Sequence, residues 1–283
     1  MNGIILTILL VISGIIIIGL SWGFIEAMCL KVTRDKLILG PSEGDPDLRI
    51  LFFSDLHREF CPIPASRVIN VIRKEHASKG LDAVIFGGDI CNGKGKHVLR
   101  GLPYLNAIGD VCKELSIPYM AVTGNHDWGA DGEDLCQFNF DNINHCIKYL
   151  KSRRDGQYMA IGGVLDTGRH ERLWMAPTEP SAGIPYKKYI LISHNPDLAL
   201  HMPPQTKVKI DAMISGHIHG GQIRTPFGIE FALRHDELPY IGVISGIHEV
   251  NGIKLYISKG LGCVFLPFRF FARPEINIIE ISA

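Results

Sequence analysis

Residues 48–57 read LRILFFSDLH, and this stretch decides how the chain is organised. Residues 49–53, RILFF, form a short pattern that is typical of a buried strand. Asp55 and His57, two side chains that can bind metal, follow directly. In open α/β sheets ligands bind beyond the carboxyl ends of the strands. The stretch therefore predicts a buried strand that delivers polar side chains to the edge of a sheet.

Helices and strands alternate after this stretch. Residues 66–79 carry apolar side chains at partly helical spacing, and residues 97–115 also look helical. Residues 81–86 and 118–123 have strand patterns. The order is strand, helix, strand, helix, strand, which predicts a largely parallel sheet with helices on its faces.

The rest of the chain contains more strand patterns around an irregular middle. We expect strands at residues 188–192, 212–215, 241–250, 253–258 and 275–281, with an Asn-Gly hairpin turn at 251–252. Residues 128–185 are rich in Gly, Asp and Asn, so we expect loops there, one of which can act as a lid over the site.

Side chains that can bind metal follow five of the predicted strands. A lone histidine is more often a surface or core residue than a ligand. The occurrence of Asp, Asn or His after each of five predicted strands is much harder to explain by chance. Carboxylate, imidazole and amide ligands together suit borderline or hard divalent cations. The candidate ligands are Asp55, His57, Asp89, Asn125, His194, His217 and His219.

These residues resemble the motifs of the calcineurin-like metallophosphoesterase family. The matching patterns are D-x-H at 55–57, GD at 88–89, GNHD at 124–127, His194, and GHIH at 216–219. The stretches SHNPDLAL (193–200), HGGQI (219–223) and RFFARPEI (269–276) resemble its bacterial membrane-anchored phosphodiesterase branch. The resemblance implies an α/β fold, a four-layer αββα sandwich of the metallo-dependent phosphatase type, preceded by one transmembrane helix.

The resemblance also implies a role for each matching residue. It assigns one metal ion to Asp55, His57 and His219, and the other to Asn125, His194 and His217, with Asp89 as the bridging carboxylate. His126 becomes the catalytic residue that faces the phosphate. Two cations ~3.5–4 Å apart lower the pKa of a shared water and hold the phosphoryl oxygens for in-line attack by a metal-bound hydroxide. The expected cofactors are two divalent metal ions, manganese first and iron, zinc or cobalt as alternatives.

One position departs from the family pattern. Many members have a second acid three residues after the bridging Asp, where it can orient the catalytic histidine, but this chain has Asn92. An amide oxygen can accept a hydrogen bond from an imidazole N–H, but it cannot stabilise an imidazolium as a carboxylate would.

The N-terminal residues 1–30 predict a transmembrane anchor. Residues 4–20 carry no charge and are long enough to cross most of a bilayer, and bulky residues follow where a signal peptide would be cleaved. Lys31, Arg34 and Lys36 come next, which predicts a single-pass protein of the cell membrane with its catalytic domain in the cytoplasm. Seven scattered cysteines without a CxxC motif favour reduced thiols, in agreement with that compartment.

We divide the chain into the anchor at 1–30, a lead-in or edge strand at 31–47, and a metallophosphoesterase domain at 48–283. Phe265, Leu266, Phe268, Phe270 and Phe271 form an apolar cluster, either in the core or as a membrane-facing edge that accepts an amphiphilic substrate.

The predicted reaction is hydrolysis of a phosphodiester or a pyrophosphate. One alternative is a lipid-linked pyrophosphohydrolase such as UDP-2,3-diacylglucosamine hydrolase, and another is a non-catalytic metal-binding scaffold. Lys and Arg number 29 and Asp and Glu number 29, so no global field attracts nucleic acid. We predict no specific nucleic-acid or protein partner.

Overall fold

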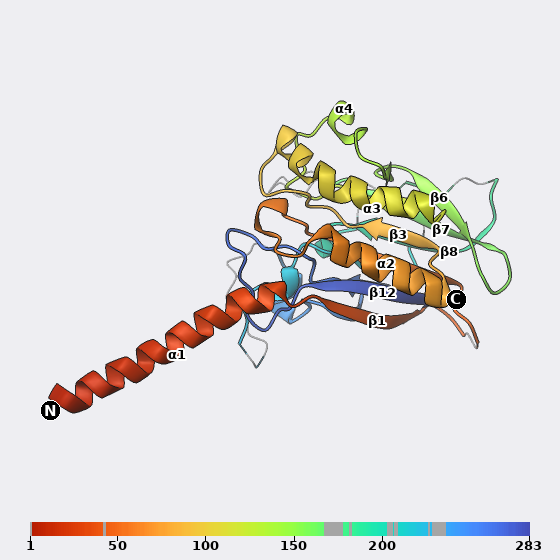
Figure 1. The fold of residues 1–283 in the computed structure, drawn as a ribbon. Helices are drawn as coiled ribbons and strands as arrows, with labels where there is room; N and C mark the ends of the chain where they lie inside the picture. The colour runs from red at the N-terminus through yellow and green to blue at the C-terminus, as the bar shows by residue number, and fades with distance from the viewer. Residues whose placement is uncertain are drawn as a thin grey trace.

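Two mixed sheets face each other in the computed structural model, which describes residues 2–41, 44–166, 178–180, 183–202, 206, 209–225, 227 and 236–283 (Figure 1). Within these residues the first sheet has the order β1 (Lys31–Ile38), β12 (Glu275–Ser282), β2 (Leu48–Phe53), β3 (Ala83–Phe86), β4 (Tyr119–Ala121) and β5 (Asp141–Asn142). The second sheet has the order β10 (Gly246–Val250), β11 (Ile253–Ile257), β9 (Ala212–Ser215), β8 (Tyr186–Ser193), β7 (Tyr158–Val164) and β6 (Ile147–Lys151). The predicted α/β architecture with two sheets is confirmed.

Strand β2 joins two hydrophobic cores because its successive side chains point to opposite faces of the sheet. Ile50 and Phe52 are buried between the two sheets. Leu51 and Phe53 are buried on the other face, beneath helices α2 (Ala65–Lys79) and α3 (Leu102–Glu114). Burial on both faces explains why the strand is apolar except at Arg49, whose buried guanidinium pairs with Glu75 of α2.

The helices agree with the predicted pattern except at the start of α3. In α2 the buried residues Val68 and Ile72 are one turn apart, and Gly80 ends the helix with φ 71°. The 3-10 segment η2 (Gly95–Gly101) replaces the first turns of the helix predicted at 97–115. A further 3-10 segment, η1 (Arg58–Phe60), follows β2.

Short 3-10 segments cover the outer face of the second sheet in the described part of the chain. Segments η3 (Pro196–Ala199) and η5 (Leu238–Ile241) supply Leu198 and Leu238 to the core that contains Tyr189 and Leu191 of β8. A third segment, η4 (His219–Gly221), lies at the end of β9. The fourth layer of the sandwich is therefore built from 3-10 turns where the first layer has α-helices.

The prediction of loops for residues 128–185 is wrong for a large part of that range. It contains the short helix α4 (Gly132–Leu135) and strands β5, β6 and β7. Two glycines of this range, Gly162 and Gly163, lie in β7. A Cβ at Gly162 would collide with the Tyr189 ring, and one at Gly163 would collide with Ile143. These glycines permit close packing inside a strand. Residues 167–177 and 181–182 lie outside the described residues, so a lid stays a prediction.

The strand predicted at 241–250 is also shorter in the structure. Only Gly246–Val250 forms β10, and Ile241 ends the 3-10 segment η5. Gly242 has φ 80°, a left-handed conformation that separates the two elements.

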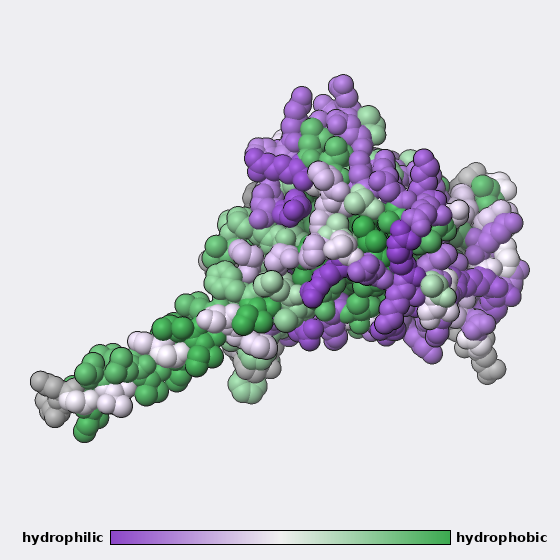
Figure 2. Space-filling view, viewed as in Figure 1, coloured by the Kyte–Doolittle hydropathy of each residue, from purple (hydrophilic) through white to green (hydrophobic). Residues whose placement is uncertain are grey.

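Helix α1 (Asn2–Met28) extends away from the domain (Figure 1). By length and composition, residues 3–28 can cross a membrane. Most of its large apolar side chains are exposed, and Figure 2 shows its surface as largely hydrophobic. Its last turns contact the domain.

Strand β1 forms the edge of the first sheet. It pairs with β12 in parallel over its whole length, from Lys31 opposite Glu275 to Ile38 opposite Ser282. Within residues 31–47, the part at 31–38 is the edge strand. A domain boundary at residue 48 would separate this strand from its sheet.

We expect a soluble fragment of residues 48–283 to be less stable than one of residues 29–283, because removal of β1 exposes the hydrogen-bonding edge of β12. The loss should lower Tm by roughly 10 °C, since each kcal/mol lowers the Tm of a domain of this size by about 2–4 °C. Thermal unfolding followed by circular dichroism measures both fragments. Equal Tm values would show that β1 is dispensable.

Candidate metal centre

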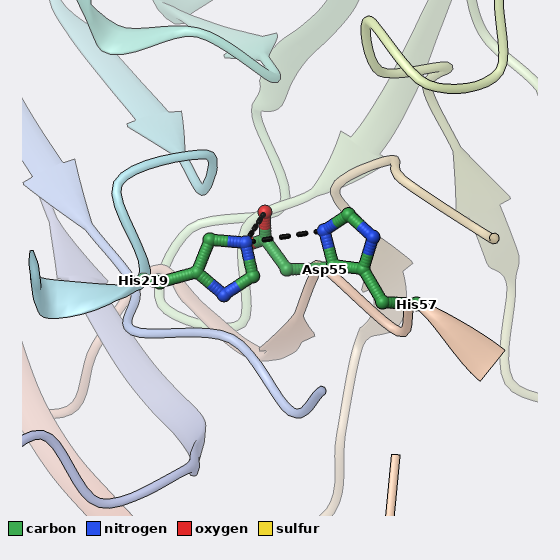
Figure 3. Close-up of side chains that lie close together, drawn as sticks. All are labelled: Asp55, His57 and His219. Carbon is green, nitrogen blue, oxygen red and sulfur yellow. Dashed lines mark hydrogen bonds and ion pairs between the residues drawn. The ribbon is translucent and has the colours of Figure 1, made fainter. Parts of the chain in front are cut away.

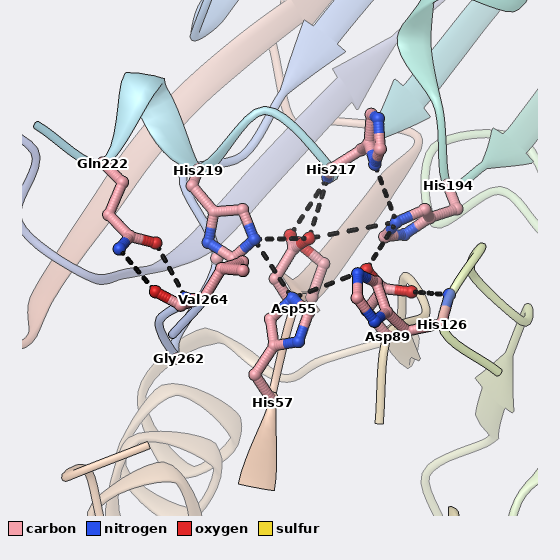
Figure 4. Close-up of polar contacts among 12 residues, drawn as sticks. Asp55, His57, Asp89, His126, His194, His217, His219, Gln222, Gly262 and Val264 are labelled. Atoms are coloured by element: carbon pink, nitrogen blue, oxygen red, sulfur yellow. Dashed lines mark hydrogen bonds and ion pairs between the residues drawn. The ribbon is translucent and has the colours of Figure 1, made fainter. Parts of the chain in front are cut away.

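The predicted ligands meet where strands of both sheets end. Asp55 follows β2, Asp89 follows β3, and Asn125 follows β4 in the first sheet. His194 follows β8, and His217 follows β9 in the second. Figure 4 shows the carboxylates and imidazoles converging from these loops. The rim at which the strands end is therefore the candidate site.

A first cluster contains Asp55, His57 and His219 (Figure 3). His57 Nε2 and His219 Nε2 are 3.1 Å apart, and His219 Nε2 is 3.5 Å from Asp55 Oδ1. All three residues are buried. Two imidazole nitrogens and a carboxylate oxygen that face one another form a set of ligands for a divalent cation.

A second cluster contains Asp89, His194 and His217. His194 Nε2 lies 3.1 Å from Asp89 Oδ2 and 3.3 Å from His217 Nδ1. The other nitrogen of His194, Nδ1, donates a hydrogen bond to the carbonyl oxygen of Gly87 at 2.7 Å when Nε2 is a ligand. That bond fixes the orientation of the ring.

One oxygen of Asp89 faces both clusters. Asp89 Oδ2, which is 3.1 Å from His194 Nε2, also lies 3.4 Å from His57 Nε2. The other oxygen, Oδ1, accepts the backbone N–H of His126 at 2.8 Å. This geometry suits a carboxylate that bridges two cations.

The ionisation of the site also fits cations. Burial lowers the pKa of His57 to about 4. The His57 ring is therefore neutral and has a lone pair for a metal. Burial opposes ionisation of Asp89, but the charge and hydrogen bond of His194 hold the pKa of Asp89 well below its usual range. A bound cation would take over the role of the proton that His194 carries beside Asp89.

Asn125 is the predicted ligand that no contact connects to either cluster in the described residues. Its Oδ1 atom is buried and has no hydrogen-bond partner in that part of the chain. A buried acceptor without a donor is costly, and a cation would satisfy it. Its role as a ligand stays a prediction.

His126 lies beside the first cluster, with its ring 5.0 Å from that of His57. Its Nδ1 is 2.9 Å from the backbone carbonyl oxygen of Asn92, which can accept only from a protonated nitrogen. In the neutral ring, Nε2 is therefore the free nitrogen. The sequence left open whether Asn92 could replace the acid that orients the histidine in many family members. In the structure the backbone carbonyl of Asn92, and not its side chain, is the hydrogen-bond partner of His126.

Five of the seven candidate ligands have backbone conformations that sequence patterns do not predict. Asp55, His57, Asp89, His217 and His219 have φ values of 53°, 39°, 61°, 70° and 54°. A left-handed conformation in a residue other than glycine costs on the order of 1–2 kcal/mol and is common at functional sites. The surrounding loops must hold this strain.

Two buried charged residues without a predicted role hold the loops. Asp127 accepts the N–H groups of Asp89, Ile90 and Gly124 at 2.8–2.9 Å. Arg269 donates to the carbonyl oxygens of Lys259, Gly260, Gly262, His219 and Ala272. Both residues lie in quoted motifs, GNHD and RFFARPEI, which are the only sequence signals that point to them.

Asp236 orients His217 from outside the cluster. Its Oδ1 accepts from His217 Nε2 at 3.0 Å, while His217 Nδ1 faces His194. Burial lowers the pKa of His217, but the hydrogen bond and charge of Asp236 outweigh it and raise that pKa. A carboxylate that holds the second nitrogen of a metal-binding histidine fixes the ring and strengthens the ligand. No sequence pattern identifies Asp236.

We expect Asp236→Asn to weaken Mn²⁺ binding by about 10- to 100-fold, as losses of such outer partners do. The measurement is calorimetric titration of the full-length protein in detergent. The matched control is Glu237→Gln, which removes the neighbouring charge that pairs with His201. Equal affinities of wild type and Asp236→Asn would contradict the assigned role.

The comparisons with known proteins agree with this geometry. Residues 48–221 match the calcineurin-like phosphoesterase family. The chain is 27% identical to phosphodiesterase YaeI of Escherichia coli (strain K12), covering 91% of this chain and 90% of YaeI. It is 28% identical to the uncharacterized metallophosphoesterase YkoQ of Bacillus subtilis (strain 168), covering 83% of each chain. The same organism's uncharacterized metallophosphoesterase YkuE is 25% identical, covering 85% of this chain and 81% of YkuE.

The matched residues 48–221 include every residue of the two clusters, and the similarity to YkuE and YaeI covers most of the chain. The chain belongs to the calcineurin-like phosphoesterase family and is a phosphoric ester hydrolase.

Proposed function

We propose that this protein is anchored in the cell membrane and hydrolyses a phosphodiester or pyrophosphate bond with two divalent cations. Asp89 Oδ2, which faces both clusters, is the observation that carries the proposal. One cation is held by Asp55, His57 and His219, and the other by Asn125, His194 and His217. When bound, the cations neutralise phosphoryl oxygens and activate water, manganese being the first candidate.

His126 supplies the proton for the leaving oxygen. The oxygen of a water molecule joins phosphorus and the proton of that water passes to solvent, while the bond to the leaving oxygen breaks and that oxygen takes the proton of His126. The Asn92 carbonyl keeps Nδ1 of His126 protonated and so leaves Nε2 to carry the transferred proton. The partner of Nδ1 in this chain is therefore a backbone carbonyl oxygen, where many family members have a carboxylate.

The proposed bond type rests on the relatives. YaeI is named a phosphodiesterase, and it covers most of this chain. A lipid-linked pyrophosphate, such as UDP-2,3-diacylglucosamine, contains a bond of related chemistry and is the second candidate, which the apolar helix α1 favours. Lys31, Arg34 and Lys36 follow α1 and favour a cytoplasmic domain.

We expect Asp89→Asn to lower the turnover of bis-p-nitrophenyl phosphate by about a thousandfold or more, because an amide cannot neutralise two cations. The assay uses full-length protein with Mn²⁺, and release of p-nitrophenol is followed. Asp141→Asn, an exposed carboxylate that pairs with Lys148, is the matched control.

Full activity of Asp89→Asn would exclude this mechanism. A folded wild type that binds Mn²⁺ but turns over neither diesters nor lipid-linked pyrophosphates would instead support the non-catalytic scaffold.

His126→Gln should lower turnover by about 100-fold or more for diesters with an alkyl leaving group, which need a proton. The loss should be much smaller for p-nitrophenol, a good leaving group. Asn92→Ala keeps the backbone carbonyl, so we expect it to leave both rates unchanged. Equal losses for both leaving groups in His126→Gln would contradict the role of the histidine as an acid.

A further inference from the structure

The end of helix α1 is fixed to a loop of the catalytic domain. The backbone N–H of Arg269 donates to the carbonyl oxygen of Gly23 at 3.0 Å. The Phe268 ring lies so close to Gly23 that a Cβ there would collide with it, and it meets Phe24 edge-on at 5.4 Å. Contact with both backbone and side chains holds the helix against this loop.

Glu26 strengthens the joint. It is buried, and its carboxylate accepts the N–H groups of Ala272 at 2.7 Å and Phe271 at 3.1 Å. Trp22 Nε1 donates to the same carboxylate at 2.9 Å. A buried carboxylate needs such partners, so removing the loop from the helix would be costly.

Two arginines satisfy the carbonyl groups where the helix ends. Arg67 donates to the Met28 carbonyl oxygen at 2.8 Å, and Arg273 donates to that of Cys29 at 3.0 Å. Positive charge at a helix C-terminus is favourable, and carbonyl groups near a bilayer need donors. The domain is therefore attached to α1 in one orientation.

An α1 helix that crosses a bilayer would place this joint at the membrane surface. A hydrocarbon layer of about 30 Å takes about 20 helical residues. An apolar span that begins at Gly3 therefore reaches the polar boundary near Trp22 and Gly23. Phe268 and Arg269 contact the helix at that level.

The same loop exposes apolar side chains beside the joint. Phe265, Leu266 and Phe271, here called the aromatic rim, are 82%, 57% and 47% exposed. Figure 2 shows hydrophobic surface that continues from α1 onto the adjacent end of the domain, while hydrophilic surface dominates the opposite end. Phe265 and Phe271 also have φ values of 68° and 54°. Glycine would be favoured there, so two bulky side chains are present at a conformational cost.

The loop is also a wall of the metal centre. The N–H of Gly262 donates to the Asp55 carbonyl oxygen at 2.7 Å. Val264 and the side chain of Gln222 exchange two hydrogen bonds of 2.8 and 3.0 Å beside His219 (Figure 4). Arg269 of the same loop donates to the His219 carbonyl oxygen at 3.3 Å. One continuous segment thus contacts the helix, carries the rim and borders the ligands.

We propose that the aromatic rim inserts into the interfacial layer of the bilayer that holds α1, and that the site acts on a phosphoester whose apolar part stays in that bilayer. Aromatic side chains are well suited to this layer, and Arg67 and Arg273 beside the joint favour anionic lipid. This inference rests on the proposed function and assigns its substrate class. A lipid that diffuses laterally would reach the cations past the rim.

Insertion is tested without any reaction. Full-length Phe265→Trp is placed in vesicles of phosphatidylcholine and phosphatidylglycerol with brominated acyl chains, which quench tryptophan at close range. The control is Ile38→Trp. Ile38 is likewise exposed, at 57%, but it is the last residue of the edge strand β1, whose first residue lies near the end of α1. The wild-type emission is subtracted from that of each variant. We expect the added tryptophan of Phe265→Trp to be quenched more strongly than that of Ile38→Trp, and equal quenching would overturn the proposal.

The substrate class is tested with one leaving group in two settings. Phe265→Gly/Leu266→Ser, which suits the left-handed backbone at 265, is compared with wild type on bis-p-nitrophenyl phosphate and on the p-nitrophenyl ester of a membrane phosphatidic acid. We expect the double substitution to lower the rate of hydrolysis of the lipid about ten-fold and to leave the rate on the soluble ester unchanged. A ten-fold loss corresponds to less free energy than the burial of one apolar side chain provides.

Equal rates of the variant and wild type on the lipid, or equal losses on both esters, would overturn the assignment. If wild type hydrolyses neither ester nor a lipid-linked pyrophosphate, the proposed function fails, and the quenching experiment still decides whether the rim inserts.

Discussion

The two halves of the site meet at Asp89 Oδ2, which lies 3.4 Å from His57 Nε2 and 3.1 Å from His194 Nε2. His57 belongs to the first sheet and His194 to the second, so both sheets must present their strand ends at one rim. The loops do this in strained conformations, held by the buried groups of Asp127 and Arg269. The packing between the sheets provides the rigidity that this requires.

Much of the fold could be predicted from sequence, because its central strands are mostly apolar and are bounded by residues typical of turns and loops. Residues 212–215 form β9 as predicted, and β2, β3, β4 and β8 lie within two residues of their predicted bounds. The failures are local. The glycine-rich range 128–185 contains strands, and Gly162 and Gly163 of β7 lie where a Cβ would not fit. Residues 31–38 form an edge strand because they pair with β12, which is far away in sequence.

The ligand residues were identified by motif, and the structure places seven of the eight named site residues in three overlapping groups, with the ligand atoms of each group within 4.8 Å of one another. Asn125 lies at the predicted strand end without such a contact. Asp236 could not be predicted, because it lies in no motif and contacts His217 only in the folded chain. The hydrogen-bond partner of His126 could not be predicted either. It is the backbone carbonyl oxygen of residue 92, which is present whatever the side chain at that position.

The joint between α1 and the loop at 262–273 connects the proposed membrane anchor to the site, because that loop also borders His219. The proposed function nevertheless depends first on the bridging role of Asp89. The most direct test is anomalous X-ray diffraction from crystals of the full-length protein grown with Mn²⁺. We expect two manganese peaks with the Asp89 carboxylate between them. A single peak, or two peaks that Asp89 does not connect, would contradict it.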